Sequence, residues 1–195
     1  MPAHSSDTQP SDAQRNDTFT APANFNPDYD AVIIGGGIQG TGCAQALAAR
    51  GFSVLLLEQN KLASGTSSRS SKLIHGGLRY LETAQFSLVR KSLNERALLC
   101  ELAPGLVELK DFYLPVYRSS RVGRLKMAAG LGLYSMLGNF RKDARFCVVP
   151  KSEWDSLQGL KLDDLVCVYR YHDAQTDDQQ LTRAVAHSAQ KLGAT

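Results

Sequence analysis

The stretch Asp30-Ala-Val-Ile-Ile-Gly-Gly-Gly-Ile-Gln-Gly-Thr-Gly42, followed by Ser53-Val-Leu-Leu-Leu-Glu58, decides the fold. It contains a β-branched apolar run, a glycine turn, a segment of small residues at helical spacing and a second apolar run that ends in an acid. This order predicts a strand, a turn, a helix and a parallel strand. Such a unit binds the ADP half of a dinucleotide.

Each glycine of the turn has a physical role in that unit. Gly35 allows the tight turn after the first strand, Gly37 lets the backbone approach a pyrophosphate, and Gly40 lets the helix pack close to the strand. The N–H groups at the start of the helix then face the diphosphate. Glu58 stands where a carboxylate can accept hydrogen bonds from ribose hydroxyls. The motif alone does not separate FAD from NAD. The expected cofactor-binding turn also includes Gly36, Ile38 and Gln39.

The composition is that of a globular chain with an uneven charge. The 195 residues are 43% hydrophobic, which allows one large domain or one and a half. Residues 1–30 contribute a net charge of −4 to the overall +3, so residues 31–195 carry +7. A basic folded part suits an anionic ligand such as a phosphate ester, or an anionic membrane surface, and it equally suits a solvated basic surface.

Residues 1–28 are polar and almost free of large apolar side chains, so we expect a disordered tail. This segment has no apolar core of a secretory signal, and no run of about 18 apolar residues occurs to span a membrane. The cysteines are widely spaced, which favours reduced thiols in a cytoplasmic protein over disulfides or a metal site. These cysteines are Cys43, Cys100, Cys147 and Cys167.

The rest of the chain alternates predicted helices and strands, which indicates an α/β fold. Helices are expected at 86–103, 122–140 and from Thr176 or Asp177 to Gly193, and strands at 112–117, 146–149 and 166–171. Pro115 predicts an edge position for the strand that contains it. A parallel core needs a third strand beside the first. We expect that strand to follow the last helix, but the chain stops at Thr195. We therefore interpret the fold as incomplete and the chain as the N-terminal part of a longer protein.

A second motif follows the acid, Leu62-Ala-Ser-Gly-Thr-Ser-Ser-Arg-Ser-Ser-Lys-Leu-Ile-His-Gly-Gly-Leu-Arg-Tyr-Leu81. Its hydroxyls and backbone N–H groups can meet a diphosphate or the edge of a flavin, and Lys72 adds a cation. Gly76 and Gly77 let the backbone pass close to a flat ring. By composition alone, a flexible serine-rich linker with a Gly-Gly turn is as good an interpretation. Its position directly after the second strand favours the cofactor.

Together the two motifs resemble the FAD-dependent, quinone-linked glycerol-3-phosphate dehydrogenases. The resemblance runs from Tyr29 to the end and covers less than half of a typical member. It implies a Rossmann-like FAD-binding core interleaved with part of a substrate domain. Residues 29–81 would begin the core, 82–172 would contribute to the substrate domain, and 173–195 would return to the core. Further matching segments are 90–104, 130–134, 171–173 and 177–178.

The resemblance also implies roles for single residues. His75 would lie near the flavin, Arg79 would bind the substrate phosphate, and Tyr80 is a second candidate for substrate contact. For Arg79 a structural ion pair is the competing interpretation. The implied cofactor contacts are Gly35, Gly36, Gly37, Ile38, Gln39, Gly40, Glu58, Thr66, Ser67, Ser71, Lys72 and Leu73.

The implied reaction is oxidation of sn-glycerol 3-phosphate to dihydroxyacetone phosphate, with electrons passed to a membrane quinone. That acceptor implies the cytoplasm or the inner face of the cytoplasmic membrane. We expect no metal and no nucleic acid, and an oligomer is compatible with the intact protein. The helix at 122–140 is basic at both ends; it suits a membrane surface, but packing on a sheet is the favoured interpretation.

Three alternatives stay open. A related oxidase would pass electrons to O₂. A NAD-linked Rossmann dehydrogenase would share the glycine turn, although the serine-rich His-Gly-Gly stretch argues against it. A truncated chain could be inactive, with the intact parent the dehydrogenase. The residues present identify no general base, and further substrate contacts are expected beyond Thr195.

Overall fold

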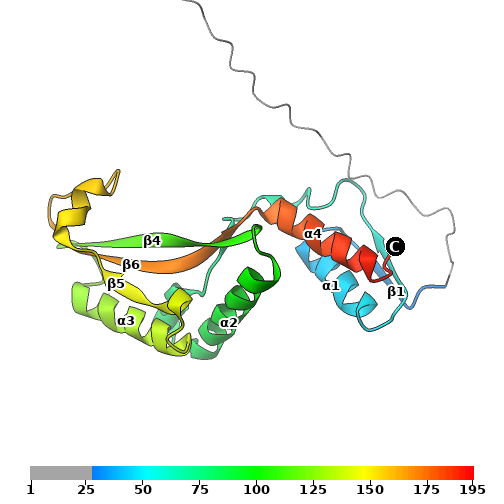
Figure 1. The fold of residues 1–195 in the computed structure, drawn as a ribbon, viewed down its shortest axis with the longest axis horizontal. Coiled ribbons are helices and arrows are strands. Elements are labelled where there is room, and N and C mark those ends of the chain that lie inside the picture. Colours follow the sequence, from blue (N-terminus) through cyan, green and yellow to red (C-terminus); the bar gives the residue numbers. More distant parts are fainter. Residues whose placement is uncertain (1–27) are drawn as a thin grey trace, which may run out of the picture.

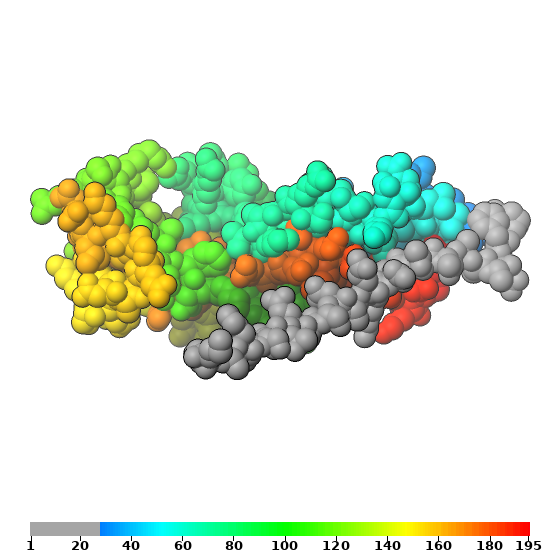
Figure 2. Space-filling model, turned by 90° about the horizontal axis from the view of Figure 1, so that it is seen from above, coloured from blue at the N-terminus to red at the C-terminus, as the bar shows by residue number. Residues whose placement is uncertain are grey.

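The computed structural model describes residues 28–195, and nearly all of the expected tail lies outside these described residues. The molecule is elongated, with two groups of elements at opposite ends (Figure 1). A two-stranded sheet with two helices forms one end, and a larger antiparallel sheet with two helices forms the other. Figure 2 shows the blue-green segment after the second strand running along the molecule between the two ends.

The first group is the expected dinucleotide-binding unit. Strand β1 (Ala31–Ile34) leads through the glycine turn to helix α1 (Ile38–Ala48), and β2 (Val54–Leu57) pairs with β1 in parallel, with Ala31 opposite Val54. Helix α4 (Asp178–Lys191) lies beside α1. Small buried side chains let these elements approach closely and form one apolar cluster, Ala44, Ala48, Val54, Ala189 and Ala194.

The end of the chain continues this sheet on the outer edge of β2. The Thr195 N–H donates to the Val54 carbonyl at 2.8 Å, and the Leu56 N–H donates to the Thr195 carbonyl at 2.8 Å. The expectation that the chain would next pair beside the first strand is therefore wrong, because Thr195 pairs with β2. The physical reason is the packing of α4 beside α1, because the chain leaving α4 then reaches the sheet next to β2.

The second group is a four-stranded antiparallel sheet. Its long central strand β6 (Leu165–Thr176) pairs on one side with β4 (Val107–Tyr117) and on the other with β3 (Leu73–Ile74) and β5 (Phe146–Val148). Because Leu73 pairs with Gln175, the serine-rich segment enters this sheet directly after Lys72. Strand β4 is an edge strand among the described residues, as Pro115 predicts.

Helices α2 (Phe86–Leu102) and α3 (Arg124–Leu137) lie on the same face of this sheet (Figure 1). Leu131 of α3 packs against Val116, Cys167 and Tyr169 of the strands. The interpretation of residues 122–140 as a helix packed on a sheet is therefore confirmed. Short 3-10 segments complete the structure, η1 (Thr66–Ser68), η2 (Leu78–Thr83), η3 (Lys142–Ala144) and η4 (Lys151–Ser156).

The expected helices and strands all occur, with differences at their ends. Strands β4 and β6 each extend beyond the expected range, because alternating polar residues in them pair across the sheet as well as apolar ones do. Asp177 caps α4 by accepting hydrogen bonds from the Gln179 and Gln180 N–H groups, each at 3.0 Å. Among residues 28–195, no helix combines the length and the apolarity needed to cross a bilayer.

Candidate cofactor turn and substrate groove

The glycine turn is built so that no side chain fits at its key positions. Gly35 has φ of +109°, a conformation that favours glycine. A Cβ on Gly40 would overlap the Gly35 carbonyl oxygen, and a Cβ on Gly37 would lie 2.9 Å from the Ser67 hydroxyl oxygen. Glycine is therefore required at position 35 by its conformation, and at positions 37 and 40 by close contacts within the turn.

The start of α1 offers hydrogen-bond donors rather than a side-chain cap. Gly37 is the N-cap residue and has no side chain to accept the first N–H groups. The Ile38 N–H donates instead to the Ser67 hydroxyl at 2.9 Å. Ser67 thus lies over the helix start, next to the turn where the resemblance implies that this loop runs along a diphosphate. A nucleotide diphosphate fits this arrangement of glycines, N–H groups and hydroxyls.

Glu58 faces back into the glycine turn. One carboxylate oxygen accepts the Gly36 N–H at 2.7 Å and the other accepts the Asn60 N–H at 2.9 Å. These hydrogen bonds, with that from Gly36 the stronger cause, lower the pKa of Glu58. Each carboxylate oxygen retains a second lone pair. Glu58 therefore fixes the turn, and it remains an acceptor for a ribose hydroxyl.

Lys72 is held by the first turn of α4. Its ammonium lies 2.6 Å from Asp178 Oδ1, and the second oxygen of Asp178 accepts from the Ser70 hydroxyl at 2.8 Å and from the Ser70 N–H at 3.1 Å. The hydrogen bond from Lys72, followed by those from Ser70, holds the pKa of Asp178 well below its ordinary value. Ser71 is exposed beside this pair. The cation predicted for the cofactor is thus engaged with a carboxylate in this structure.

A groove of about 830 Å³ separates the segment that follows β3 from helix α3. His75, Arg79 and Tyr80 all line it, and Leu73 lies at the same groove. The structure thus brings together the three residues that the resemblance assigned to chemistry and substrate. Residues of α3 line the opposite side of the groove. Strand β6 contributes Tyr171 and Asp173 to its lining. The α3 residues are Lys126, Met127, Ala129, Gly130 and Leu133.

Two polar side chains that line this groove, those of His75 and Arg79, are not engaged by the fold. Within the described part of the chain, neither His75 nor Arg79 makes a side-chain hydrogen bond or an ion pair. The structural ion pair considered for Arg79 is therefore not formed among residues 28–195. A guanidinium and an imidazole on the wall of a groove can bind an anionic ligand.

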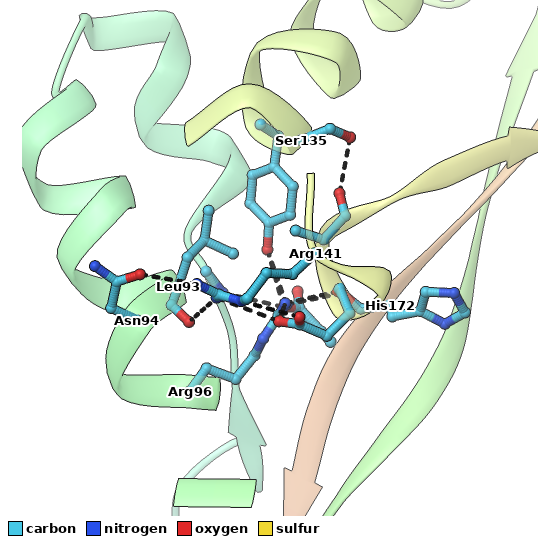
Figure 3. Close-up of polar contacts among 11 residues, drawn as sticks. Leu93, Asn94, Arg96, Ser135, Arg141 and His172 are labelled. Carbon is cyan, nitrogen blue, oxygen red and sulfur yellow. Dashed lines mark hydrogen bonds and ion pairs between the residues drawn. The ribbon is translucent and has the colours of Figure 1, made fainter. Parts of the chain in front are cut away.

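A buried charged cluster lies behind the groove, and sequence reasoning missed it. Arg96 of α2 is fully buried and forms ion pairs with Asp173 at 2.6 Å and with Asp143 at 2.7 Å (Figure 3). The signal was its position on the buried face of α2, seven residues after Val89 and three after Leu93. A charge on an apolar stripe indicates a buried partner, but the partner itself cannot be read from that spacing.

Comparisons with known proteins agree with this architecture. The model of the family described as FAD dependent oxidoreductase matches residues 30–195. Glycerol-3-phosphate dehydrogenase of Mycobacterium leprae is 45% identical over 168 residues, which are 85% of this chain and 28% of that protein. Aerobic glycerol-3-phosphate dehydrogenase of Staphylococcus aureus is 39% identical over 170 residues, 87% of this chain and 30% of that protein.

The crystal structure of glycerol-3-phosphate dehydrogenase from Bacillus halodurans, complexed with FAD, superposes with a TM-score of 0.60 at 27% identity. The match covers 87% of this chain and 26% of that one. This chain thus spans less than a third of these relatives. The family match argues against a NAD-linked Rossmann dehydrogenase, because members of the matching family depend on FAD. From the glycine turn to Thr195, the chain belongs to the FAD-dependent oxidoreductase family.

Proposed function

We propose that this chain supplies the FAD-binding turn and part of the substrate site of an enzyme that oxidises sn-glycerol 3-phosphate to dihydroxyacetone phosphate. The observation that carries the proposal is the groove in which His75, Arg79 and Tyr80 meet with Arg79 unpaired. Relatives named glycerol-3-phosphate dehydrogenase align with almost all of the described residues, which supports this substrate.

Residues of this chain bind both the cofactor and the substrate in the proposed enzyme. The N–H groups of the turn and the hydroxyls of Thr66 and Ser67 bind the diphosphate, and Glu58 holds the turn while accepting from the ribose. Arg79 binds the phosphate of the substrate with its planar guanidinium group. Tyr80 lines the same side of the groove. Bound FAD supplies the two-electron acceptor for the carbon–hydrogen bond that is oxidised.

The first experiment is an absorbance spectrum from 300 to 550 nm of the purified chain after incubation with FAD and removal of unbound FAD, followed by anaerobic addition of glycerol 3-phosphate. Flavin bands that bleach support the complete proposal. Bands that persist show cofactor binding without turnover, and the absence of bands contradicts cofactor binding by this chain. If substrate bleaches the flavin, rates of reoxidation by a soluble quinone and by O₂ then distinguish a dehydrogenase from an oxidase.

The assignment of Arg79 is tested by substitution. We expect Arg79→Ala to weaken glycerol 3-phosphate binding about 100-fold, because a charge-assisted interaction of about 3 kcal/mol is lost. Affinity for FAD should stay unchanged. Arg118→Ala is the matched control, since Arg118 is exposed and lies outside the groove. Titration calorimetry of the FAD-loaded variants measures their affinities for glycerol 3-phosphate. Equal affinities of Arg79→Ala and Arg118→Ala would show that Arg79 does not bind the substrate.

Quinone as acceptor and contact with the inner membrane face are further parts of the proposal. Leu125 and Phe140, at the two ends of the α3 region, are exposed by 79% and 57%. Arg124 and Lys142 lie next to these ends, which suits an anionic lipid surface. Co-sedimentation with vesicles that contain phosphatidylglycerol, compared with neutral vesicles, tests this contact. Equal sedimentation with both would contradict a charge-based contact.

A further inference from the structure

Asp173 of β6 forms the floor of the groove and joins three other elements. Its Oδ1 atom accepts hydrogen bonds from Arg96 Nη1 at 2.6 Å, from the Gly76 N–H at 3.0 Å and from the Tyr134 hydroxyl at 3.0 Å. Asp173 is only 3% exposed, and Arg96 and Tyr134 are 0% and 1% exposed. One carboxylate oxygen thus connects α2, α3 and the turn after β3.

The turn is seated on this cluster at Gly76. A Cβ on Gly76 would overlap the Tyr134 hydroxyl and would lie 2.5 Å from Leu93 Cδ2. Gly77 follows with φ of +75° and is the N-cap residue of η2, which contains Arg79 and Tyr80. His75 directly precedes Gly76. The backbone between the groove-lining residues is therefore held at Gly76 by one hydrogen bond and by close packing.

The partners of Asp173 are themselves fixed. Arg96 Nη2 donates to the Asp143 carboxylate and to the Asp143 carbonyl, each at 2.7 Å, and Nη1 donates to the His172 carbonyl at 2.8 Å (Figure 3). Burial, followed by the charge of Asp173, raises the pKa of Tyr134, so its hydroxyl stays a donor. An apolar cluster could fill the same volume with equal or greater stability. Directional bonds add a defined position for the carboxylate.

We infer that Asp173, held by Arg96 and Tyr134, is a positioning residue that sets the geometry of the segment from His75 to Arg79. In this role it acts through its hydrogen bond from the Gly76 N–H. The consequence for substrate binding rests on the proposed function. The effect of Asp173 on the turn itself does not depend on the proposed function, so it can be measured separately.

The variants are Tyr134→Phe and Asp173→Asn, made in the full chain. Tyr134→Phe removes one donor to Asp173, and Asp173→Asn removes its charge while keeping its shape. Ser135→Ala is the matched control, because Ser135 is also buried on α3 and its hydroxyl donates to the Ala144 carbonyl at 2.7 Å without contacting the turn.

The first measurement needs no ligand. Amide hydrogen exchange of Gly76 is compared with that of Leu93 in the core of α2, and NMR signals of the His75 ring and the Arg79 Nε–H group are recorded. We expect the Gly76 to Leu93 exchange ratio to rise about fivefold to tenfold in both variants, with shifted His75 and Arg79 signals. Ser135→Ala should leave the ratio and the signals at wild-type values.

Loss of thermal stability in all three variants, with an unchanged exchange ratio and unchanged His75 and Arg79 signals, would show that the cluster is only structural. If Asp173→Asn does not fold, Tyr134→Phe decides alone. The second measurement is affinity for glycerol 3-phosphate, which we expect to fall at least fivefold while affinity for FAD is kept. If the wild-type chain does not bind glycerol 3-phosphate, the proposed function fails, and the exchange data still decide whether Asp173 positions the turn.

Discussion

Gly40 and Gly42 lie two residues apart on α1 and meet different surroundings. A Cβ on Gly40 would overlap the Gly35 carbonyl oxygen, whereas a Cβ on Gly42 meets nothing within 4 Å. We expect Gly40→Ala to destabilise the chain by about 1–3 kcal/mol and to weaken FAD binding, because the turn must open. Gly42→Ala should stabilise it by about 1 kcal/mol. Urea denaturation and FAD titration check both, and shifts in the same direction would contradict the packing described here.

The first turn of α4 and the serine-rich loop are joined by the pair of Lys72 and Asp178. Because the pKa of Asp178 is lowered in the folded chain, the unfolded chain binds its proton first as pH falls. The contribution of Asp178 to stability is therefore complete at neutral pH. It declines as pH falls from about 5 through the unfolded value of about 3.9 towards the lower folded value.

We expect Asp178→Asn to lower the urea midpoint at pH 7 and to flatten its decline between pH 6 and pH 3. Asp177→Asn is the control, since asparagine keeps the oxygen that caps α4 while a neighbouring negative charge is also removed. Denaturation curves across this pH range measure the effect. Parallel pH profiles for wild type and Asp178→Asn would show that the pair does not carry this dependence.

The molecule has apolar clusters in separate places, and this division has consequences for unfolding. Ala189 packs with Ala44 and Val54 at the nucleotide end, while the larger sheet has its own cores around Leu93 and Leu131. Each end is therefore expected to respond separately to a change in its own core. Trp154, the single tryptophan, lies at the larger sheet, where its indole N–H donates to the Val149 carbonyl at 3.2 Å.

Ala189→Leu should overpack the contact between α1 and α4 and cost about 1–3 kcal/mol at that end. We expect the midpoint of FAD release in urea to fall, while the midpoint of Trp154 fluorescence stays near that of wild type. Gln190→Leu adds a leucine at an exposed position of the same helix and is the control. Coincident shifts of both probes in Ala189→Leu would show that the two ends unfold as one unit.

Local rules made much of the structure predictable from the amino-acid sequence. The order of the glycine turn and apolar runs predicts the parallel pair of β1 and β2 with α1 between them, because glycine conformation and helix packing act within a few residues. The spacing of apolar residues predicts α2 and α4. The sequence offers Thr176 or Asp177 as the cap of α4, and in the structure the cap is Asp177. The resemblance carried by the serine-rich motif predicts that His75 and Arg79 belong to one site.

Other features depend on contacts between segments far apart in the chain. Arg96 and Asp173 are 77 residues apart, and only the packing of α2 against β6 makes them an ion pair. The groove exists because α3 lies opposite the turn that follows β3, and Thr195 lies beside β2 because α4 packs on α1. Sequence alone determined the nucleotide-binding unit and the residue types of the site. Tertiary structure decided which charges pair, which stay open to a ligand and what holds the turn, since hydrophobic periodicity places a side chain on a face but does not name its partner.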